Sequence, residues 1–460
     1  MQEKIYDALI VGTGPAGMFA ALELIKLKPE LKILMSEKGS KRDFIRDRAN
    51  RTSGFGGAGA FSDGKLTLSS KVGGQLLDIL GEEKFNELMN YVDSRYVEFG
   101  GNNPVEFPQN SKKIKVLKER ALKAGLETVV YPVRHFGTDK AFNIIESIWN
   151  YLKEKKVEIL VNCPVESVQR NQGKLSVILN NGEEILAQNI ILAPGREGED
   201  WLLGQARALN LKVVPGIVDL GVRVEKRAEF LKHLTDSDYL GLHDLKFIYY
   251  TKSDNKVRTF CTCPYGFVTT ETYGNVVTVN GESYTNKKSE NTNFAILVSS
   301  EFTEPFKDAT GYGKYIARLA NLLAGEGKVI VQRLGDLKDG KRSYPEGLAK
   351  NIVKPTLQET TPGNLGRVLP ATILNSILEM LKKLEVVIPK INDRDTLIYG
   401  VEVKFYSSQV GINKNFQTLI SGLYIGGDGS GRTRGLLQSS MTGVIIARDI
   451  IEKGVKNGGD

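Results

Sequence analysis

The sequence predicts an α/β fold in two parts: a parallel-sheet domain assembled from both ends of the chain, and an α+β domain inserted between them. Three observations lead to this prediction. A strand, a glycine-rich turn and a helix follow one another at the N-terminus, short alternating strands begin near residue 206, and a strand with a second glycine-rich turn and a helix closes the chain. We therefore expect residues 1–205 and 396–460 to form the first domain and residues 206–395 the insert.

The composition is that of an ordinary globular protein. The 460 residues are enough for two or three domains, and 62 Lys and Arg against 54 Asp and Glu give a net charge of +8. The basic residues are scattered, without a run interleaved with aromatic residues, so we expect no nucleic-acid partner. The three cysteines do not suggest a disulfide framework, no apolar run is long enough to span a membrane, and the first strand leaves no room for a signal peptide. We expect a cytoplasmic protein with no membrane partner; the oligomeric state stays unknown.

The N-terminal stretch predicts strand, tight turn, helix and strand. Ala8 to Val11 is a continuous apolar run, typical of a parallel strand buried on both faces. Pro15 stands where the turn becomes a helix, and apolar residues then recur at helical spacing until Pro29. A second strand, Ile33 to Met35, ends just before Glu37.

The first turn carries a dinucleotide motif. Gly12, Gly14 and Gly17 fit G-x-G-x-x-G, in which the first glycine makes the turn, the second lets a pyrophosphate approach and the third packs helix against strand. The helix N-terminus offers free N–H groups to the phosphates, and Glu37 is placed to accept hydrogen bonds from a ribose. An ordinary glycine-rich turn is the alternative. The register of strand, helix and acidic residue favours a dinucleotide site, without distinguishing NAD from FAD.

Residues 39–74 are rich in glycine and serine, with Phe55 and Phe61 among them. Aromatic residues of a type usually buried favour an ordered segment that lines a ligand over a loose surface loop.

The inserted domain begins with alternating residues in "GIVDLGVRVE". One face of this strand is apolar, with Val218, Leu220, Val222 and Val224, and the other carries Asp219, Arg223 and Glu225. We expect a half-solvated antiparallel strand.

The C-terminal stretch "YIGGDGSGRTRGLLQSSMTG" distinguishes the cofactor. Its glycines are not spaced as a second G-x-G-x-x-G unit before the predicted helix. Another candidate for that motif, "GYGKYI" at 311–316, follows no predicted strand. Asp428 instead closes a strand, and Gly435 to Ala447 is predicted to be a helix. A flavin suits both features, since a ribityl hydroxyl can meet Asp428 and the N1/C2=O edge gains negative charge near the helix N-terminus. A capped helix without a ligand is the alternative.

Several stretches carry a family resemblance. "VGTGPAG" with Glu37, "NIILAPG" and "GLYIGGDGSG" resemble the dispersed signatures of glutathione-reductase-type FAD-binding folds. A further set resembles poorly characterised bacterial and archaeal FAD-dependent dehydrogenases (NAD(FAD)-utilising dehydrogenase-like): "GGAGAFSDGKL", "RHFGTD", "TFCTCPYG", "TVNGESY" and "LIYGVEV". The resemblance covers nearly the whole chain. It implies a Rossmann-type FAD-binding domain made from both chain ends and an inserted α+β substrate domain.

The resemblance also implies cofactor contacts. The first turn would meet the pyrophosphate, Glu37 the adenosine ribose, Val165 the adenine through its backbone, and Asp428 with the start of the last helix the ribityl chain and pyrimidine. The full expected set is Gly12, Thr13, Gly14, Pro15, Ala16, Gly17, Glu37, Lys38, Gly57, Ala58, Gly59, Phe61, Val165, Ala193, Gly195, Asp428, Gly435 and Leu436. Arg434 departs from the family pattern, which often has Gly there.

Three residues are candidates for chemistry. Arg434 would lie at the flavin edge, where a cation stabilises reduced flavin or holds an anionic substrate, although a surface ion pair is the alternative. His135 precedes a predicted helix, and a structural role is its alternative. Cys261 and Cys263, at i and i+2 on a predicted strand, are expected to point to the same face; they are too few for zinc, so we expect no metal site. Cys263 is the third candidate, with inert buried thiols as the alternative.

These features predict an FAD-dependent oxidoreductase, a dehydrogenase that moves a hydride or electron pair between flavin and an organic small-molecule substrate held by residues 206–395. NAD(P)H would act as a transient reductant, or a partner protein would supply electrons. Two alternatives stay open: a flavin-dependent C=C reductase of a lipid-like substrate, and a non-catalytic FAD-binding protein that senses redox state or binds a partner.

Overall fold

The computed structural model describes residues 5–41, 53–61, 64–107, 111–171, 173–214, 216–236, 242, 246–273, 275–284, 287–300, 308–325, 327–406 and 408–457. The chain forms two compact units. The first comprises residues 1–106, 131–215 and 407–460, and the second comprises residues 107–130 and 216–406.

These borders differ from the sequence boundaries at 206 and 395 because of strand pairing that periodicity does not reveal. β11 (Val213–Val214) pairs with β21 (Gln409–Val410), which keeps both in the first unit. β20 (Leu397–Phe405) pairs with β12 (Val218–Arg227), and β5 (Glu127–Val129) pairs with β13 (Lys246–Tyr250), so these segments belong to the second unit.

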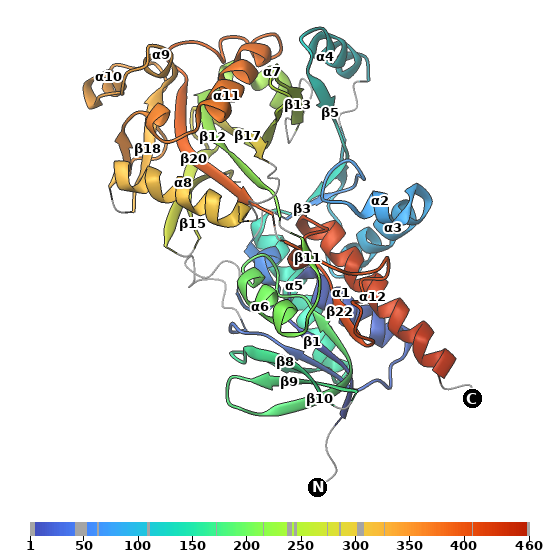
Figure 1. Ribbon diagram of the computed structural model, residues 1–460. Helices are drawn as coiled ribbons and strands as arrows, with labels where there is room; N and C mark the ends of the chain where they lie inside the picture. Colours follow the sequence, from blue (N-terminus) through green and yellow to red (C-terminus); the bar gives the residue numbers. More distant parts are fainter. Residues whose placement is uncertain are drawn as a thin grey trace. The chain divides into compact units, whose positions relative to one another are not determined.

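The first unit is built on a seven-stranded mixed sheet of order β7-β2-β1-β10-β9-β8, with β22 paired to β10 (Figure 1). Its strands are β1 (Ile5–Val11), β2 (Ile33–Ser36), β7 (Glu158–Leu160), β8 (Val165–Asn171), β9 (Lys174–Leu179), β10 (Glu184–Leu192) and β22 (Leu423–Ile425). β7, β2, β1, β10 and β22 run parallel, and β9 and β8 continue the sheet antiparallel.

Helices and short elements complete this unit. They are α1 (Pro15–Leu27), α2 (Leu76–Leu80), α3 (Glu82–Glu98), α5 (Thr138–Glu154), α6 (Glu199–Ala208), α12 (Gly435–Asn457), the 3-10 helices η1 (Gly57–Phe61) and η4 (Asp428–Ser430), and the three-stranded sheet of β3 (Lys65–Thr67), β6 (Val133–His135) and β4 (Val105–Glu106).

Successive residues of the central strands enter two different apolar layers. Ile10 and Met35 pack with residues of α1, α3, α5 and α12, whereas their neighbours Leu9 and Leu34 pack with residues of β8, β9 and α6. Side chains of a strand alternate between the faces of a sheet, so both faces of this sheet are covered. The first unit is therefore a Rossmann-type α/β unit built from both ends of the chain.

The second unit is α+β. Its eight-stranded sheet has the order β19-β18-β20-β12-β17-β14-β13-β5, and β15 and β16 form a separate hairpin. The remaining strands are β14 (Lys256–Cys263), β15 (Phe267–Tyr273), β16 (Val276–Glu282), β17 (Asn291–Ser300), β18 (Val329–Arg333) and β19 (Thr360–Pro362). The helices are α4 (Ser111–Lys123), α7 (Lys232–Thr235), α8 (Ala309–Ala324), α9 (Leu334–Lys338), α10 (Pro345–Ala349), α11 (Ala371–Leu384), η2 (Ala228–Phe230) and η3 (Leu365–Arg367).

The expectation of a half-solvated strand at 218–225 is wrong. Every residue of β12 is buried except Arg227, which is partly exposed. The β15–β16 hairpin packs on β12, β17 and β20, and it helps to cover the charged face. The charges are buried because each has partners: Arg223 pairs with Glu402 at 3.2 Å, and Asp219 pairs with Arg258. Alternation alone cannot distinguish a solvated polar face from a paired buried one.

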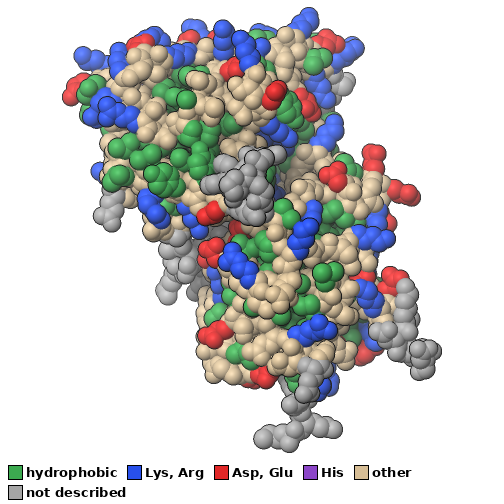
Figure 2. Space-filling model, viewed as in Figure 1, with side chains coloured by type: hydrophobic (Ala, Val, Ile, Leu, Met, Phe, Trp, Pro, Cys, Tyr) green, Lys and Arg blue, Asp and Glu red, His purple; other side chains and the backbone are tan. Residues whose placement is uncertain are grey.

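The surface shows no single dominant patch on the face drawn in Figure 2, where Lys and Arg side chains are interspersed with Asp and Glu. Hydrophobic side chains are exposed where α8 lies, among them Tyr315, Leu322 and Leu323. In the part of the chain that the structure describes, no helix is both long and apolar enough to cross a membrane.

Candidate functional site

The first glycine turn joins the end of β1 to the start of α1. Gly12 has a φ of +95°, and its N–H donates to the Ser36 carbonyl oxygen at 2.8 Å. A Cβ on Gly12 would lie 2.3 Å from the Ala193 carbonyl oxygen, so only glycine fits where the turn crosses the end of β10.

The next two glycines have opposite surroundings. A Cβ on Gly17 would lie 2.0 Å from the Gly12 carbonyl oxygen, so this glycine allows α1 to pack closely on the turn. A Cβ on Gly14 would meet no heavy atom within 4 Å, which leaves open space beside the N-terminus of α1. A helix N-terminus with an open approach suits a phosphate group.

The second glycine turn joins β22 to α12 in the same unit. Gly426 N–H donates to the Leu192 carbonyl oxygen of β10 at 2.9 Å, and Gly427 N–H donates to Thr442 Oγ1 at 2.8 Å. Gly435, the first residue of α12, is exposed, with φ at +78° and no heavy atom within 4 Å of a built Cβ. The start of α12 therefore also faces open space.

Small residues bring the two helices together. A Cβ on Gly443 in α12 would lie 2.2 Å from the Ala16 carbonyl oxygen of α1, and a Cβ on Gly427 would lie 2.9 Å from Ala16 Cβ. A Cβ on Gly59 in η1 would lie 3.0 Å from Leu436 and 3.2 Å from Pro15. The structure thus brings together three of the predicted segments: 12–17, 57–61 and 428–436.

The end of β10 joins the same place. Gly195 has a φ of +66° and open space around its built Cβ, and a Cβ on Gly429 would lie 3.1 Å from the Gly195 carbonyl oxygen. The carboxyl ends of β1, β10 and β22, adjacent parallel strands, therefore present their glycines at one edge of the sheet. This edge is where open α/β sheets bind ligands.

Asp428 is nearly enclosed beside the start of α12, with its side chain 18% exposed. It accepts hydrogen bonds from Thr433 Oγ1 at 3.2 Å and from the Gly435 N–H, and Arg196 Nε lies 3.8 Å from its Oδ2. Burial raises the pKa of Asp428, and the charges of Arg196 and Arg434 oppose that increase. Asp428 is thus a cap of α12 and retains acceptor capacity.

Glu37 is buried between the first turn and residues 53–54. Its Oε2 accepts from the Thr13 N–H and Oγ1, and its Oε1 accepts from the N–H groups of Gly39 and Gly54. The ribose contact that the sequence suggested stays a prediction.

The remaining predicted contacts are dispersed around this edge. Lys38 forms an exposed ion pair with Glu197 at 3.0 Å, Ala58 is exposed, and the Val165 side chain packs in the core of the sheet. Phe55 packs edge-on against Trp149, as expected of an ordered segment. The Phe61 side chain and residues 42–52 lie outside the described part. The structure therefore tests only part of the prediction that residues 39–74 form an ordered segment that lines a ligand.

The three chemistry candidates lie on different elements. The Arg434 N–H donates to the Gly73 carbonyl oxygen at 2.6 Å, directly before α12. His135 ends β6, and its carbonyl oxygen accepts from Asn103 Nδ2 at 2.7 Å. Cys263 lies in β14 of the second unit, 3.2 Å from Arg223 Nη2.

β14 is irregular at Cys261 and Cys263, which the sequence predicted to share a face of the strand. The register of β14 against β17 shifts between Phe260 and Cys263, and Cys261 has a φ of +48°. A bulge adds one residue to the strand, so the period of two is lost at this position. No group of three or more His, Cys, Asp and Glu side chains that could hold a metal occurs within the described ranges.

Sequence reasoning missed a clamp on the second turn. The Gln75 N–H donates to the Arg432 carbonyl oxygen at 2.8 Å, and a Cβ on Gly74, whose φ is +130°, would lie 2.4 Å from that oxygen. The Gly-Gly pair at 73–74 is a signal of close backbone approach that could have indicated it. Arg196 was also missed, and no local signal identifies it, because the pairing of β10 with β22 brings it to Asp428.

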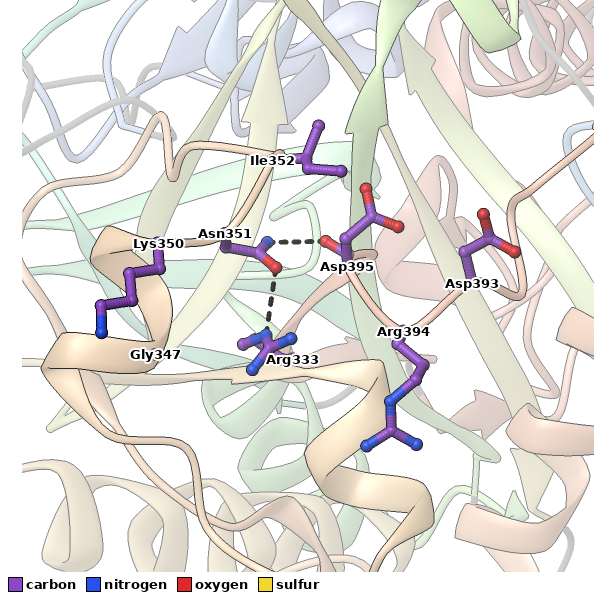
Figure 3. A pocket seen from close by; sticks show the side chains of 8 residues that line it. All are labelled: Arg333, Gly347, Lys350, Asn351, Ile352, Asp393, Arg394 and Asp395. Carbon is purple, nitrogen blue, oxygen red and sulfur yellow. Dashed lines mark hydrogen bonds between the residues drawn. The ribbon is translucent and has the colours of Figure 1, made fainter.

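An open cleft of about 490 Å³ lies elsewhere, within the second unit (Figure 3). Asn351, one of its lining residues, accepts a hydrogen bond from Arg333 Nε at 3.0 Å and donates one to the Asp395 carbonyl oxygen at 2.7 Å. The cleft is lined by Arg333, Gly347, Lys350, Asn351, Ile352, Asp393, Arg394 and Asp395. None of these belongs to the glycine turns, so this cleft is not the predicted cofactor site.

Comparisons with known proteins bear on both units. A model of the family described as "FAD-dependent protein, C-terminal domain-like" matches residues 218–405, the range from β12 to β20. An uncharacterized protein from Clostridium beijerinckii is 27% identical over 483 residues, covering 97% of this chain and 80% of that protein.

Solved structures resemble the chain only loosely. Glycine oxidase from Geobacillus kaustophilus has a TM-score of 0.42 at 13% identity, covering 97% of this chain and 95% of that one. Pyridoxine 4-oxidase from Mesorbium loti has a TM-score of 0.47 at 12% identity, covering 97% and 99%. L-proline dehydrogenase from P. horikoshii has a TM-score of 0.41 at 11% identity, covering 98% and 94%. At these values the likeness assigns neither a substrate nor a reaction.

Proposed function

We propose that this protein is an FAD-dependent oxidoreductase that transfers a hydride or an electron pair between bound flavin and an organic small molecule. One observation carries the proposal: the N-termini of α1 and α12 meet, with open glycines, at the carboxyl ends of parallel strands. The description of the family model that matches residues 218–405 supports FAD as the cofactor.

The residues at this edge fit an extended dinucleotide. Open space at Gly14 suits the pyrophosphate at the N-terminus of α1, and open space at Gly195 and Gly435 suits the rest of the cofactor. Asp428 has acceptor capacity beyond its bonds to Thr433 and Gly435, so it can bind a ribityl hydroxyl. When bound, the flavin supplies the two-electron chemistry.

Positive charge near Asp428 gives this edge a second role. Arg196 and Arg434 both act electrostatically on Asp428, beside the N-terminus of α12. Two guanidinium groups and a helix N-terminus stabilise negative charge, either on reduced flavin or on an anionic substrate. Arg434 is therefore the first candidate for a residue that acts in the reaction. His135 and Cys263 stay candidates without a contact that assigns them a role.

The second unit is the proposed substrate-binding part, in line with its place as an insert. NAD(P)H or a partner protein would reduce the flavin transiently, because the sequence carries only one dinucleotide motif. We propose no nucleic-acid and no membrane partner.

The cofactor is tested by purification. The protein should be yellow and should release FAD on heating, and the apo-protein should recover the flavin spectrum when FAD is added. Colourless protein that FAD does not reconstitute would contradict the proposal.

Electron transfer needs a separate experiment. Anaerobic stopped-flow mixing of the FAD-loaded protein with NADH and with NADPH should bleach the flavin, and an acceptor screen should then restore its colour. A flavin that no donor reduces would count against the oxidoreductase and favour a non-catalytic FAD-binding protein that binds a partner.

A further inference from the structure

The carboxylate of Glu37 is buried, with only 6% of the residue exposed. Four donors of the protein itself reach it. The Thr13 N–H lies 3.1 Å and Thr13 Oγ1 2.8 Å from Oε2, while the N–H groups of Gly39 and Gly54 lie 2.9 and 2.8 Å from Oε1. An ionised carboxylate has about four acceptor positions in total. Each oxygen therefore already has its full complement of hydrogen bonds.

These four bonds tie three separate backbone segments together. Thr13 belongs to the first glycine turn, Gly39 follows β2, and Gly54 precedes η1. A Cβ on Gly39 would lie 2.4 Å from the Gly54 nitrogen, and the Gly56 N–H donates to the Thr13 carbonyl oxygen at 3.0 Å. The segments are thus in close contact, and Glu37 accepts hydrogen bonds from all three of them.

We propose that Glu37 is a positioning residue that joins the first glycine turn to the start of η1, and that it does not bind the adenosine ribose of the cofactor. A ribose hydroxyl would have to displace one of these four donors, a backbone N–H or the Thr13 hydroxyl, and the displaced group would lose a hydrogen bond to a charged group. Its function is to fix the turn at Gly14 and the segment at Gly59 relative to each other before any ligand binds. The ribose part of this inference rests on the proposed FAD function.

Apo-protein is the first test, because a ribose contact exists only when the cofactor is bound. In Glu37→Gln, the amide group cannot accept hydrogen bonds, so one pair of donors loses its partner. Peptides containing residues 13 and 54 should exchange their amide hydrogens about tenfold faster or more in the variant than in wild type, measured by mass spectrometry without FAD. Unchanged exchange in these peptides would overturn the inference.

Two further variants keep this test decisive. Glu154→Gln makes the same substitution at an exposed carboxylate that pairs with Lys155, and it should leave exchange at residues 13 and 54 unchanged. Thr13→Val removes only the hydroxyl donor while keeping the shape of the side chain, so it serves if Glu37→Gln does not fold. It should accelerate exchange in the same peptides by a smaller factor, and Thr13→Ser should restore protection.

The ribose is tested directly with FAD and with FAD analogues that lack the adenosine 2′- or 3′-hydroxyl. If Glu37 does not meet the ribose, removing a hydroxyl changes Kd by the same factor in wild type and in Glu37→Gln, within about twofold. A loss of about tenfold in wild type that vanishes in Glu37→Gln would overturn the inference. If neither protein binds FAD, the proposed function fails, and the exchange experiment still decides the role of Glu37.

Discussion

At the scale of single residues, two acidic side chains at the glycine turns differ in how the protein uses them. Glu37 accepts four hydrogen bonds from the protein, whereas Asp428 accepts from Thr433 and Gly435 and keeps acceptor capacity. Both were expected from the sequence to bind the cofactor, because each follows a parallel strand. The difference arises from neighbouring backbone N–H groups, which a motif does not contain.

Asp428→Asn should weaken FAD binding by about ten- to a hundredfold, because the cofactor loses a hydrogen bond to a charged group. Kd is measured by the quenching of flavin fluorescence as apo-protein is titrated into FAD. Glu154→Gln, at an exposed carboxylate that pairs with Lys155, is the control and should bind FAD as wild type does. An unchanged Kd in Asp428→Asn would show that Asp428 only caps α12.

The Asp428→Asn variant also tests how the free energy of unfolding depends on pH. Burial raises the pKa of Asp428, so the folded apo-protein holds this proton more tightly than the unfolded chain does. The contribution of Asp428 to the free energy of unfolding is therefore fully present below the ordinary carboxyl pKa of about 4 and is lost as the pH rises through the raised value. Urea unfolding of apo-protein should show wild type losing stability relative to Asp428→Asn across that window. Parallel pH profiles would contradict this.

Arg223 is a charged residue whose side chain is fully buried. It pairs with Glu402 and donates to Asn293 Oδ1 at 2.8 Å and to the Cys261 carbonyl oxygen at 2.6 Å. Arg223→Met should lower the free energy of unfolding by about 3–5 kcal/mol, because Glu402 is left buried without this partner. Thermal or urea unfolding measures the change.

The control for Arg223→Met is Arg394→Met, at the exposed pair with Asp339, which should change stability little. In addition, Arg223→Met combined with Glu402→Leu should recover part of the loss, since no unpaired charge remains between those two positions. Additive losses in the double variant would argue that the pair itself is not the cause.

At the scale of elements, the site depends on how closely α1 and α12 approach. Gly443 and Ala16 allow the two helix backbones to meet, and Gly17 lets α1 pack on its own turn. The sequence identified the turn glycines through their motif. It did not identify Gly443, because a glycine inside a helix carries no motif, and its role appears only when the two ends of the chain pack together.

Gly443→Ala should destabilise the protein by about 1–3 kcal/mol, because its Cβ would lie 2.2 Å from the Ala16 carbonyl oxygen. Gly454→Ala, on the same helix with nothing within 4 Å of its Cβ, should stabilise by about 0.5–1 kcal/mol through the helix preference of alanine. Urea unfolding of both variants gives the comparison. Equal effects at the two positions would exclude close packing as the reason for Gly443.

At the scale of the whole molecule, the site is made by segments some four hundred residues apart in the chain. β1 and β22 both lie beside β10, so the first and last glycine turns share one edge of the sheet (Figure 1). The second unit arises from residues 107–130 and 216–406, and its sheet pairs strands from both of those ranges.

FAD added to apo-protein should therefore protect both ends of the chain together. Peptides from residues 9–22 and 425–441 should slow their hydrogen exchange in parallel, because both turns contact one ligand. At a free FAD concentration of about 100 times Kd, the stabilisation should be about 2.7 kcal/mol. Protection of only one of these peptides would contradict a shared site.

Much of the site was predictable because its information is local. The order of strand, glycine turn and helix lies in consecutive residues, and it predicted the α/β class and the glycine turns near both ends of the chain. The buried polar face of β12 was not predictable, because its partners Glu402, Arg258 and Tyr399 come from distant strands.

The sequence by itself thus determined the strand, glycine turn and helix near each end of the chain and the positions of the turn glycines, since each depends on backbone preferences within a few residues. Only the tertiary structure decided the borders of the two units, the burial of Arg223, the clamp by residues 73–75 and the saturation of Glu37. Each of these depends on hydrogen bonds and contacts between segments far apart in the chain. Such contacts form only when distant segments fold together, so no short stretch of sequence specifies them.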